Sequence, residues 1–408
     1  MTPPDPSAAT DLRPAPTAGR RRVAVAGALI AAFGGFASFN LTLSALPAYA
    51  VRSGAGPSGA GALTATLMAA TLVVQPVTPW LFARIGRRHS LALSGALFGL
   101  PCLPLPAVSA LWALTGLAAL RGLGFGVFVV AGVTFTAELF PPGARGRAIG
   151  WYGAVGGAAG VLGAPAGIAL AREGAYPLVF TLAALTAGLV VAGAFCFPRT
   201  APAPAATSGS GHRGSPRATR RALRPMAGPL LVEAASTMAY GVVFTFLPLT
   251  APAAPGALLA AQLSLVPSRL GAGWLVDRYG GRRVLAPAVL VTALGTAAGA
   301  ASHQPAVLLA GTALFGAGFG AIQSATLVLA LHAAGDHPAG LGLAGVAWNI
   351  AFDGGTGAGS LLGGPLLALG GPPALFPATA AVLAVFLPFS LRSARPPEAG
   401  KSGTPPDG

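Results

Sequence analysis

Long apolar runs, separated by short polar connections, make up most of this chain. A helix needs about 20 consecutive apolar residues to cross the hydrocarbon core of a bilayer. The pattern therefore predicts an all-α integral membrane protein with twelve transmembrane helices. The twelve runs have the approximate limits 23–50, 60–83, 90–107, 109–138, 147–171, 175–197, 227–250, 256–276, 284–301, 305–333, 340–369 and 372–391.

Composition supports a membrane environment. Of the 408 residues, 54% are hydrophobic and only 9% are charged, whereas soluble domains carry about 25% charged residues. The 59 glycines fit this picture, because small residues let helices approach closely where lipid supplies no hydrophobic drive. Cys102 and Cys196 lie inside apolar runs, so we interpret them as small hydrophobic residues and not as a disulfide or a metal pair.

The basic residues predict the topology. Of the 25 Lys and Arg residues, 21 fall in the termini and in alternate connections, and only Arg52 and Arg172 fall in the other connections. Because positive residues concentrate on the cytoplasmic side, we expect both termini to be cytoplasmic and the Arg clusters to face an anionic inner leaflet. The net charge of +15 then reflects topology and not a nucleic-acid partner. A single Lys, Lys401, among abundant Ala, Gly, Pro and Arg is typical of a GC-rich bacterial gene, which favours a bacterial cytoplasmic membrane.

The two halves of the chain echo one another. Trp80 matches Trp274, and Gly86 matches Gly280 at the same offset of 194 residues. A duplication of six spans in parallel orientation is one of the known plans of membrane transporters. The predicted organisation is a disordered tail (1–22), a six-helix bundle (23–197), a cytoplasmic linker (198–226), a second six-helix bundle (227–391) and a disordered tail (392–408).

A short polar motif between the eighth and ninth runs carries a family resemblance. It comprises Gly273, Leu275, Asp277, Arg278, Gly280, Arg282 and Arg283. The chain resembles the major facilitator superfamily over about residues 20–395. The resemblance implies two pseudo-symmetric six-helix bundles, a secondary transporter that works by alternating access, and a conformational latch in this loop. Arg269 is expected to support the latch.

The first-half copy of the motif keeps Gly86, Arg87 and Arg88, but Pro79 and Ala83 replace the leading Gly and the Asp. Because Ala83 offers no carboxylate to a helix N-terminus or a nearby Arg, we expect the first-half latch to be weaker. The alternative interpretation of both loops is a cluster of basic residues that only sets the topology.

The fifth run is rich in glycine and resembles a motif of antiporter branches of the superfamily, although Ala164 separates Gly163 from Pro165. A smooth glycine face allows close packing, and a proline adds a kink. The alternative is ordinary small-residue packing. The antiporter-like glycine face comprises Gly156, Gly160, Gly163, Pro165 and Gly167.

Three charged residues inside the predicted spans are candidates for proton coupling, because charges in the membrane are costly and usually functional. Asp353 is the first candidate, since a carboxyl group at this depth can take up and release protons near neutral pH. Glu233 is the second, with pairing to Arg224 as its alternative. Arg121 directly precedes Gly122, whereas the family's Arg precedes its Gly pair by four residues. The resemblance implies proton handling or substrate attraction for Arg121, with a structural ion pair as the alternative.

Polar and aromatic side chains in several runs are candidates for lining a substrate cavity between the halves. For any single one of them, packing or a bond to the local backbone is the alternative. The candidates are Asn40, Gln75, Tyr240, Phe244, Gln323, Trp348 and Asn349.

The expected function follows from the resemblance and the glycine face. No GxxxxGK motif followed by Ser or Thr, no metal-ligand spacing and no catalytic set occurs in the sequence, so we expect no enzyme, cofactor, metal or ATP drive. We expect a monomeric, proton-coupled exporter of small, partly apolar organic compounds of the twelve-span drug:proton antiporter type. The alternatives are a symporter or facilitator that imports sugars or other metabolites, and a non-transporting receptor with the same fold.

Overall fold

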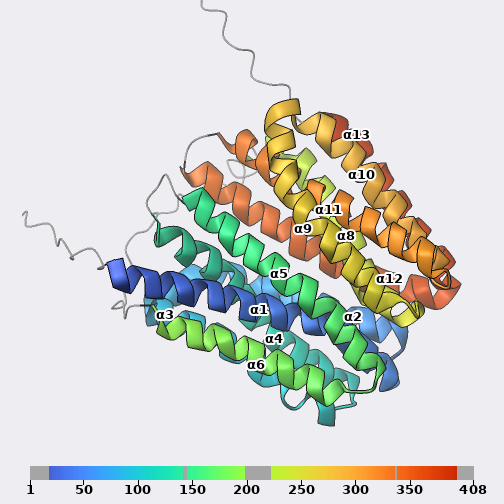
Figure 1. Ribbon diagram of the computed structural model, residues 1–408, viewed down its shortest axis with the longest axis horizontal. Coiled ribbons are helices and arrows are strands. Elements are labelled where there is room, and N and C mark those ends of the chain that lie inside the picture. Colours follow the sequence, from blue (N-terminus) through green and yellow to red (C-terminus); the bar gives the residue numbers. More distant parts are fainter. Residues whose placement is uncertain (1–17, 141–144, 198–221, 336–337, 393–408) are drawn as a thin grey trace, which may run out of the picture.

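Every regular element is a helix in the residues that the computed structural model describes, which are 18–140, 145–197, 222–335 and 338–392 (Figure 1). The long helices of the first half are α1 (Ala18–Arg52), α2 (Gly56–Val74), α3 (Thr78–Gly99), α4 (Leu111–Glu138), α5 (Arg145–Arg172) and α6 (Tyr176–Phe195). The helices of the second half are α8 (Ala227–Thr250), α9 (Ala254–Tyr279), α10 (Gly281–Ala297), α11 (Pro305–Ala334), α12 (Pro338–Val385) and α13 (Leu387–Arg392).

Nine stretches of the described chain are long and apolar enough to cross a membrane. Two of them, Gly56–Ala107 and Gly340–Ser390, contain 52 and 51 residues and are broken at Gly86 and Gly371. Each is long enough to cross twice, because an α-helix rises about 1.5 Å per residue. Counting both twice and adding the 26-residue α9 gives the twelve predicted crossings in the described part. The all-helical membrane fold is therefore confirmed.

Glycine and proline set the helix ends. Gly86 (φ 78°) and Gly280 (φ 81°) take the same left-handed backbone at matched positions of the two halves, which a residue with a Cβ adopts only at a cost. Proline occupies the first turn of α2, α6, α9 and α11, where its fixed φ suits the helix start and its missing N–H costs nothing.

These elements define two ends of the molecule. The basic end holds the start of α1 and the breaks at Gly86 and Gly280, and the Arg172 end holds the connections 52–56, 172–176 and 250–254. The α1 helix begins at Ala18, five residues before the bundle start expected at residue 23. The reason is that the arginines that precede the apolar run are good helix formers. Most of the linker (198–221) and residues 1–17 and 393–408 of the tails lie outside the described residues.

Helices α1–α6 pack mainly on one another, as do α8–α13, and Figure 1 shows the two groups side by side. The groups meet along one surface, where α2 packs on α12, α5 packs on α9, and α1 packs on α8. We call this surface the seam. Any change in the relative position of the two halves must break or rearrange the contacts made there.

Candidate functional site

Glycines bring α2 and α12 into close contact along the seam. A Cβ built on Gly61 would lie 2.1 Å from the carbonyl oxygen of Ser360, and one on Gly364 would lie 2.7 Å from the Cα of Ser58. Only glycine permits such backbone approach. Farther from the Arg172 end, a Cβ on Gly357 would meet the side chain of Met68 at 3.1 Å. The seam is therefore tightly closed from the Arg172 end to this depth.

Glycines of α5 make the same kind of contact with α9. A Cβ on Gly160 would lie 2.8 Å from the Gln262 amide, and one on Gly157 would lie 2.9 Å from Val266. One turn nearer the basic end, Gly153 is exposed and has nothing within 4 Å of its Cβ position, and Gly273 on α9, which is half-buried, has nothing within 4 Å either. The α5–α9 contact thus ends before the basic end.

The Asp353 carboxylate of α12 lies at the inner limit of the closed seam. Gln75, at the end of α2, donates a hydrogen bond from Nε2 to Asp353 Oδ2 at 2.7 Å, and both side chains are buried. The bond joins the two halves across 278 positions of sequence. The structure therefore brings together one predicted proton-coupling residue and one predicted cavity residue.

Other hydrogen bonds across the seam lie between Asp353 and the Arg172 end. Ser44 donates to the carbonyl oxygen of Phe244 at 2.7 Å, and Gln262 donates to Asn40 Oδ1 at 3.2 Å. Thr245 Oγ1 donates to Thr64 Oγ1 at 3.4 Å. These bonds join the halves over the depth in which the glycines already hold the backbones together.

Arg172, in the last turn of α5, bridges the halves at their outer rim. Its Nη1 donates to the carbonyl oxygen of Pro252 at 2.5 Å, and Nη2 donates to the carbonyls of Ala251 and, at 3.5 Å, Pro248. These acceptors lie at the C-terminal end of α8, whose dipole also favours a cation. Sequence reasoning missed this clamp. The one available signal was its position. Arg52 and Arg172 are the only two basic residues in the connections that alternate with the Arg-rich ones.

The Glu233 carboxylate is fully buried inside the second half. Gln323 Nε2 donates to its Oε1 at 2.6 Å, and Thr326 Oγ1 donates to its Oε2 at 2.7 Å. Trp348 Nε1 donates to the same threonine hydroxyl at 3.0 Å. Arg269 is the charged neighbour of Glu233, but no ion pair joins them among the described residues. The network holds α8, α11 and α12 together.

Arg121 of α4 is fully buried within the first half. Its Nε donates to the carbonyl oxygen of Phe98 at 3.3 Å, and its Nη2 donates to Thr42 Oγ1 at 2.7 Å. The guanidinium lies 4.8 Å from the centroid of the Phe98 ring, and its Nη1 has no hydrogen-bond partner in the described structure. The structural ion pair considered from the sequence does not occur there.

The latch residues fall at the basic end and contact their own half. Arg87 pairs with Glu138 at 2.6 Å, so the end of α4 provides the carboxylate that Ala83 lacks. Arg88 lies over the ring of Phe195, 4.3 Å from its centroid. In the second half, Arg278 lies over the rings of Trp274 and Tyr279, and Arg283 is exposed. The side chains of Asp277 and Arg282 lie outside the described part.

The remaining cavity candidates are packed in this structure. Tyr240 stacks on Phe244, with centroids 4.3 Å apart, and on Phe319 at 5.0 Å. Asn349 donates to the Gly345 carbonyl of its own helix at 3.1 Å. Of the glycine face, Gly156, Gly163 and Gly167 pack against α1, whereas Gly160 meets α9 across the seam. The glycine face therefore serves both packing within its half and contact between halves.

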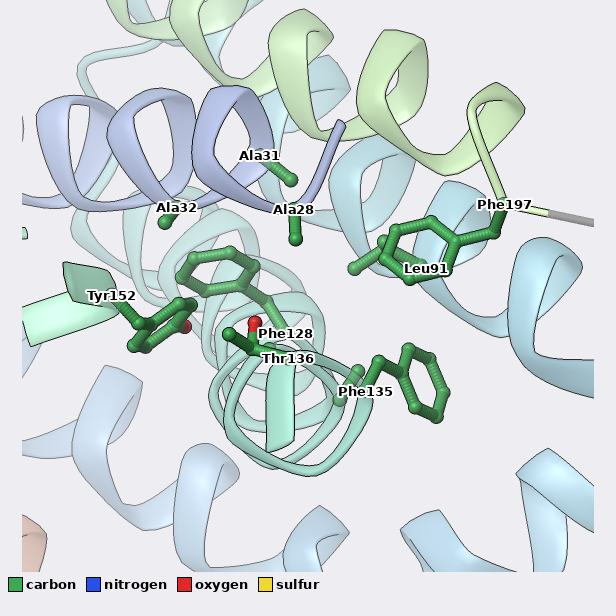
Figure 2. A pocket seen from close by; sticks show the side chains of 11 residues that line it. Ala28, Ala31, Ala32, Leu91, Phe128, Phe135, Thr136, Tyr152 and Phe197 are labelled. Carbon is green, nitrogen blue, oxygen red and sulfur yellow. The ribbon is translucent and has the colours of Figure 1, made fainter. Parts of the chain in front are cut away.

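A cavity in the first half is lined by residues of α1, α3, α4, α5 and the end of α6 (Figure 2). Its volume is about 10 Å³, which is room for about one water molecule. The hydroxyls of Thr136 and Tyr152 are buried at its wall without a partner among the described residues. These two groups face an otherwise apolar lining inside the first half, away from the seam.

Two bundles of membrane-spanning helices that meet at one seam, with a buried carboxylate at the seam's inner limit, define a class of duplicated membrane transporters. The family model described as Major Facilitator Superfamily matches residues 27–352 and, in a second match, 253–407. The chain belongs to this superfamily, which indicates a multi-pass membrane transporter and not an enzyme. No match was found among curated proteins.

Solved structures share the fold. The nucleoside transporter NupG has a TM-score of 0.68 at 13% identity, over 91% of this chain and 98% of that one. A point mutant of the same transporter gives 0.66 at 14% identity, over 90% and 97%. A D-xylose-proton symporter gives 0.70 at 15% identity, over 92% and 97%. At these identities the similarity establishes the fold alone.

Proposed function

We propose that this transporter exports small, partly apolar organic compounds in exchange for protons, with Asp353 as the coupling residue. The observation that carries the proposal is the hydrogen bond from Gln75 to Asp353 at the inner limit of the closed seam. The carboxylate is the only ionisable group among the described residues that takes part in a hydrogen bond between the halves at this depth. Its protonation state and the closure of the seam therefore act on the same contact.

The physical link is a difference in acceptor strength and in solvation. An ionised carboxylate accepts the Gln75 N–H strongly, but it is costly to bury unless its partners remain in place. Protonation makes Asp353 a weaker acceptor and removes the free-energy cost of burying its charge. Proton binding therefore shifts the balance between closed and open seams, and by linkage the seam state shifts proton affinity by the same factor.

Orientation gives the proposal its direction. With the basic end placed in the cytoplasm of a bacterial cell, as the distribution of 21 Lys and Arg residues against 2 favours, the Arg172 end faces outside. The closed part of the seam is then external, and the open faces around Gly153 and Gly273 are cytoplasmic. We infer an inward-open state, ready to accept a compound from the cell interior. Residues 23–197 and 227–391 then move as the two bundles.

Two comparisons test the function. Cells with and without this gene are exposed to a panel of toxic organic compounds. The comparison identifies a compound whose accumulation the protein lowers. Proteoliposomes then measure its uptake against an imposed proton gradient. Asp353→Asn is expected to retain exchange of the compound at equilibrium but to lose gradient-driven accumulation. Gradient-driven transport at the wild-type rate in this variant would remove Asp353 from the coupling mechanism.

Proton-coupled import is the second candidate, because a structure that shares the fold over 92% of this chain is a D-xylose-proton symporter. The same seam carboxylate serves either direction of coupling. The direction of proton movement separates the two. When substrate is added outside energised cells, symport carries protons inward and makes the medium more alkaline, whereas antiport exchanges protons outward and makes the medium more acidic. External alkalinisation would replace export with import.

A further inference from the structure

Arg121 carries a buried positive charge that the first half satisfies only in part. A guanidinium stays protonated in proteins, and each of its N–H donors that is buried without an acceptor is costly. Its Nε and Nη2 donate to the Phe98 carbonyl and to Thr42 Oγ1, whereas its Nη1 has no acceptor among the described residues. No acidic side chain pairs with Arg121 in that part of the chain. The guanidinium therefore needs one more hydrogen-bond acceptor beside Nη1.

Arg121 lines a small cavity between α1, α2 and α4. The volume of this cavity is about 10 Å³, which is room for about one water molecule. Thr42 and Thr64 also line it, and its other lining residues are apolar. The cavity therefore suits one water molecule and is too small for an organic compound.

The two threonine hydroxyls at this cavity have unused hydrogen-bonding capacity, because a hydroxyl offers one donor and two acceptor lone pairs. Thr64 Oγ1 accepts from Thr245 Oγ1 at 3.4 Å, and its own proton has no acceptor among the described residues. Thr42 Oγ1 accepts from Arg121 Nη2 at 2.7 Å, which leaves it a second lone pair. A water molecule in the cavity can accept from Arg121 Nη1 and Thr64 and donate to Thr42. This meets the need of a buried water for about two to four polar partners.

We propose that this cavity binds one structural water molecule, which accepts a hydrogen bond from Arg121 Nη1 and joins Arg121 to the Thr64 hydroxyl. Because Thr64 also contacts Thr245 of the second half, the water connects the buried charge to the seam. Thr245 lies 3.1 Å from the Ser360 hydroxyl, so the chain of polar groups continues into α12. Thr64 is thus a positioning residue for Arg121. Separation of the halves breaks the chain at the Thr64–Thr245 bond and leaves the water with the first half.

An experimental structure of the full-length protein with a closed seam, at a resolution that shows ordered water, tests the site directly. One density peak is expected in the cavity, within hydrogen-bond distance, about 2.5–3.2 Å, of both Arg121 Nη1 and Thr64 Oγ1. Density that is missing from the cavity while other buried waters are visible would overturn the proposal. So would a peak that contacts only apolar side chains.

Hydroxyl-radical footprinting tests the site in solution, with methionine as the reporter. X-rays form hydroxyl radicals from water, and these radicals oxidise a methionine that lies beside the water. Met68 lines the cavity and is fully buried, whereas Met226 is buried to nearly the same extent in a separate cluster and is the matched control. Met68 is expected to be oxidised several-fold faster than Met226. Equal rates for the two would overturn the proposal.

Two threonine variants separate the bound water from an opening of the seam. Thr64→Val and Thr245→Val both remove the hydrogen bond across the seam, but only Thr64→Val removes a partner of the water. Oxidation of Met68 should fall several-fold in Thr64→Val and return in Thr64→Ser, which restores the hydroxyl. In Thr245→Val it should stay at the wild-type rate or rise. Faster oxidation of Met68 in both valine variants would assign the wild-type signal to an opening seam and overturn the proposal, as would an unchanged rate in Thr64→Val.

Discussion

Removal of the Arg172 clamp should open the Arg172 end of the seam. In the wild type the guanidinium donates to three carbonyls at the end of α8, two of them closely. Because Arg172 is exposed, each close bond is worth about 0.2–1 kcal/mol. The helix dipole of α8 adds about 0.3–1 kcal/mol. The total of about 1–3 kcal/mol corresponds to a ~5- to 150-fold change in the ratio of open to closed states.

Distance measurements by pulsed electron paramagnetic resonance test this shift. Spin labels are placed on cysteines introduced at Glu173 and Ala253, on opposite sides of the seam, after Cys102 and Cys196 have been replaced by alanine. Arg172→Gln should move population to the longer of two distances.

Two further variants complete the comparison. Arg172→Lys should fall between wild type and the Gln variant, because an ammonium lacks the planar fork that reaches two carbonyls. Arg52→Gln is the matched control, since Arg52 stacks on Tyr176 within its own half, 5.3 Å from the ring centroid. An unchanged distance distribution in Arg172→Gln, or the same shift in the control, would refute the role of the clamp.

Other substitutions separate seam contacts from internal packing. Gly61→Ala should destabilise the closed seam relative to the open seam by about 1–3 kcal/mol, because its Cβ meets the Ser360 carbonyl. In the control Gly188→Ala, the new Cβ has nothing within 4 Å, so the spin-label distances should stay unchanged. Glu233→Ala should lower Tm in a thermal melt, since it leaves two buried donors unpaired at about 1–3 kcal/mol each. Glu233→Gln should retain proton-driven transport. Loss of coupling in Glu233→Gln with an unchanged Tm would make Glu233 the proton site. Gly280→Ala should cost about 1–3 kcal/mol of stability because φ is 81°, while Gly273→Ala should not lower Tm; equal Tm values for the two would contradict the strain argument.

Sequence predicts the features that depend on local chemistry. Apolar run length predicts the crossings, and the duplication places glycine at the two matched positions, Gly86 and Gly280, where the backbone takes a positive φ. Asp353 and Gln75 were each identified as candidates because polar groups inside membrane spans are costly. Their hydrogen bond was not predictable, since it depends on how deeply α2 and α12 interlock.

Contacts made by the backbone escaped prediction altogether. Arg172 binds carbonyl oxygens, which every residue carries, so no residue type in α8 marks the acceptor site. Pairing with Arg224 was the alternative considered for Glu233, but Gln323 and Thr326 hold its carboxylate instead. An amide and a hydroxyl from α11 satisfy acceptor sites of the carboxylate, and only the packing of α8 on α11 brings them within reach.

A reversible cross-link across the seam tests the central claim, that transport requires the two halves to separate there. Thr64 and Thr245 contact each other through their hydroxyls at 3.4 Å, so cysteines at both positions can form a disulfide when oxidised. In proteoliposomes, the oxidised double variant should stop transporting the compound selected in the panel, and reduction should restore its rate, while each single variant is unaffected. If the fully cross-linked protein transports the compound as fast as it does after reduction of the disulfide, the account is contradicted.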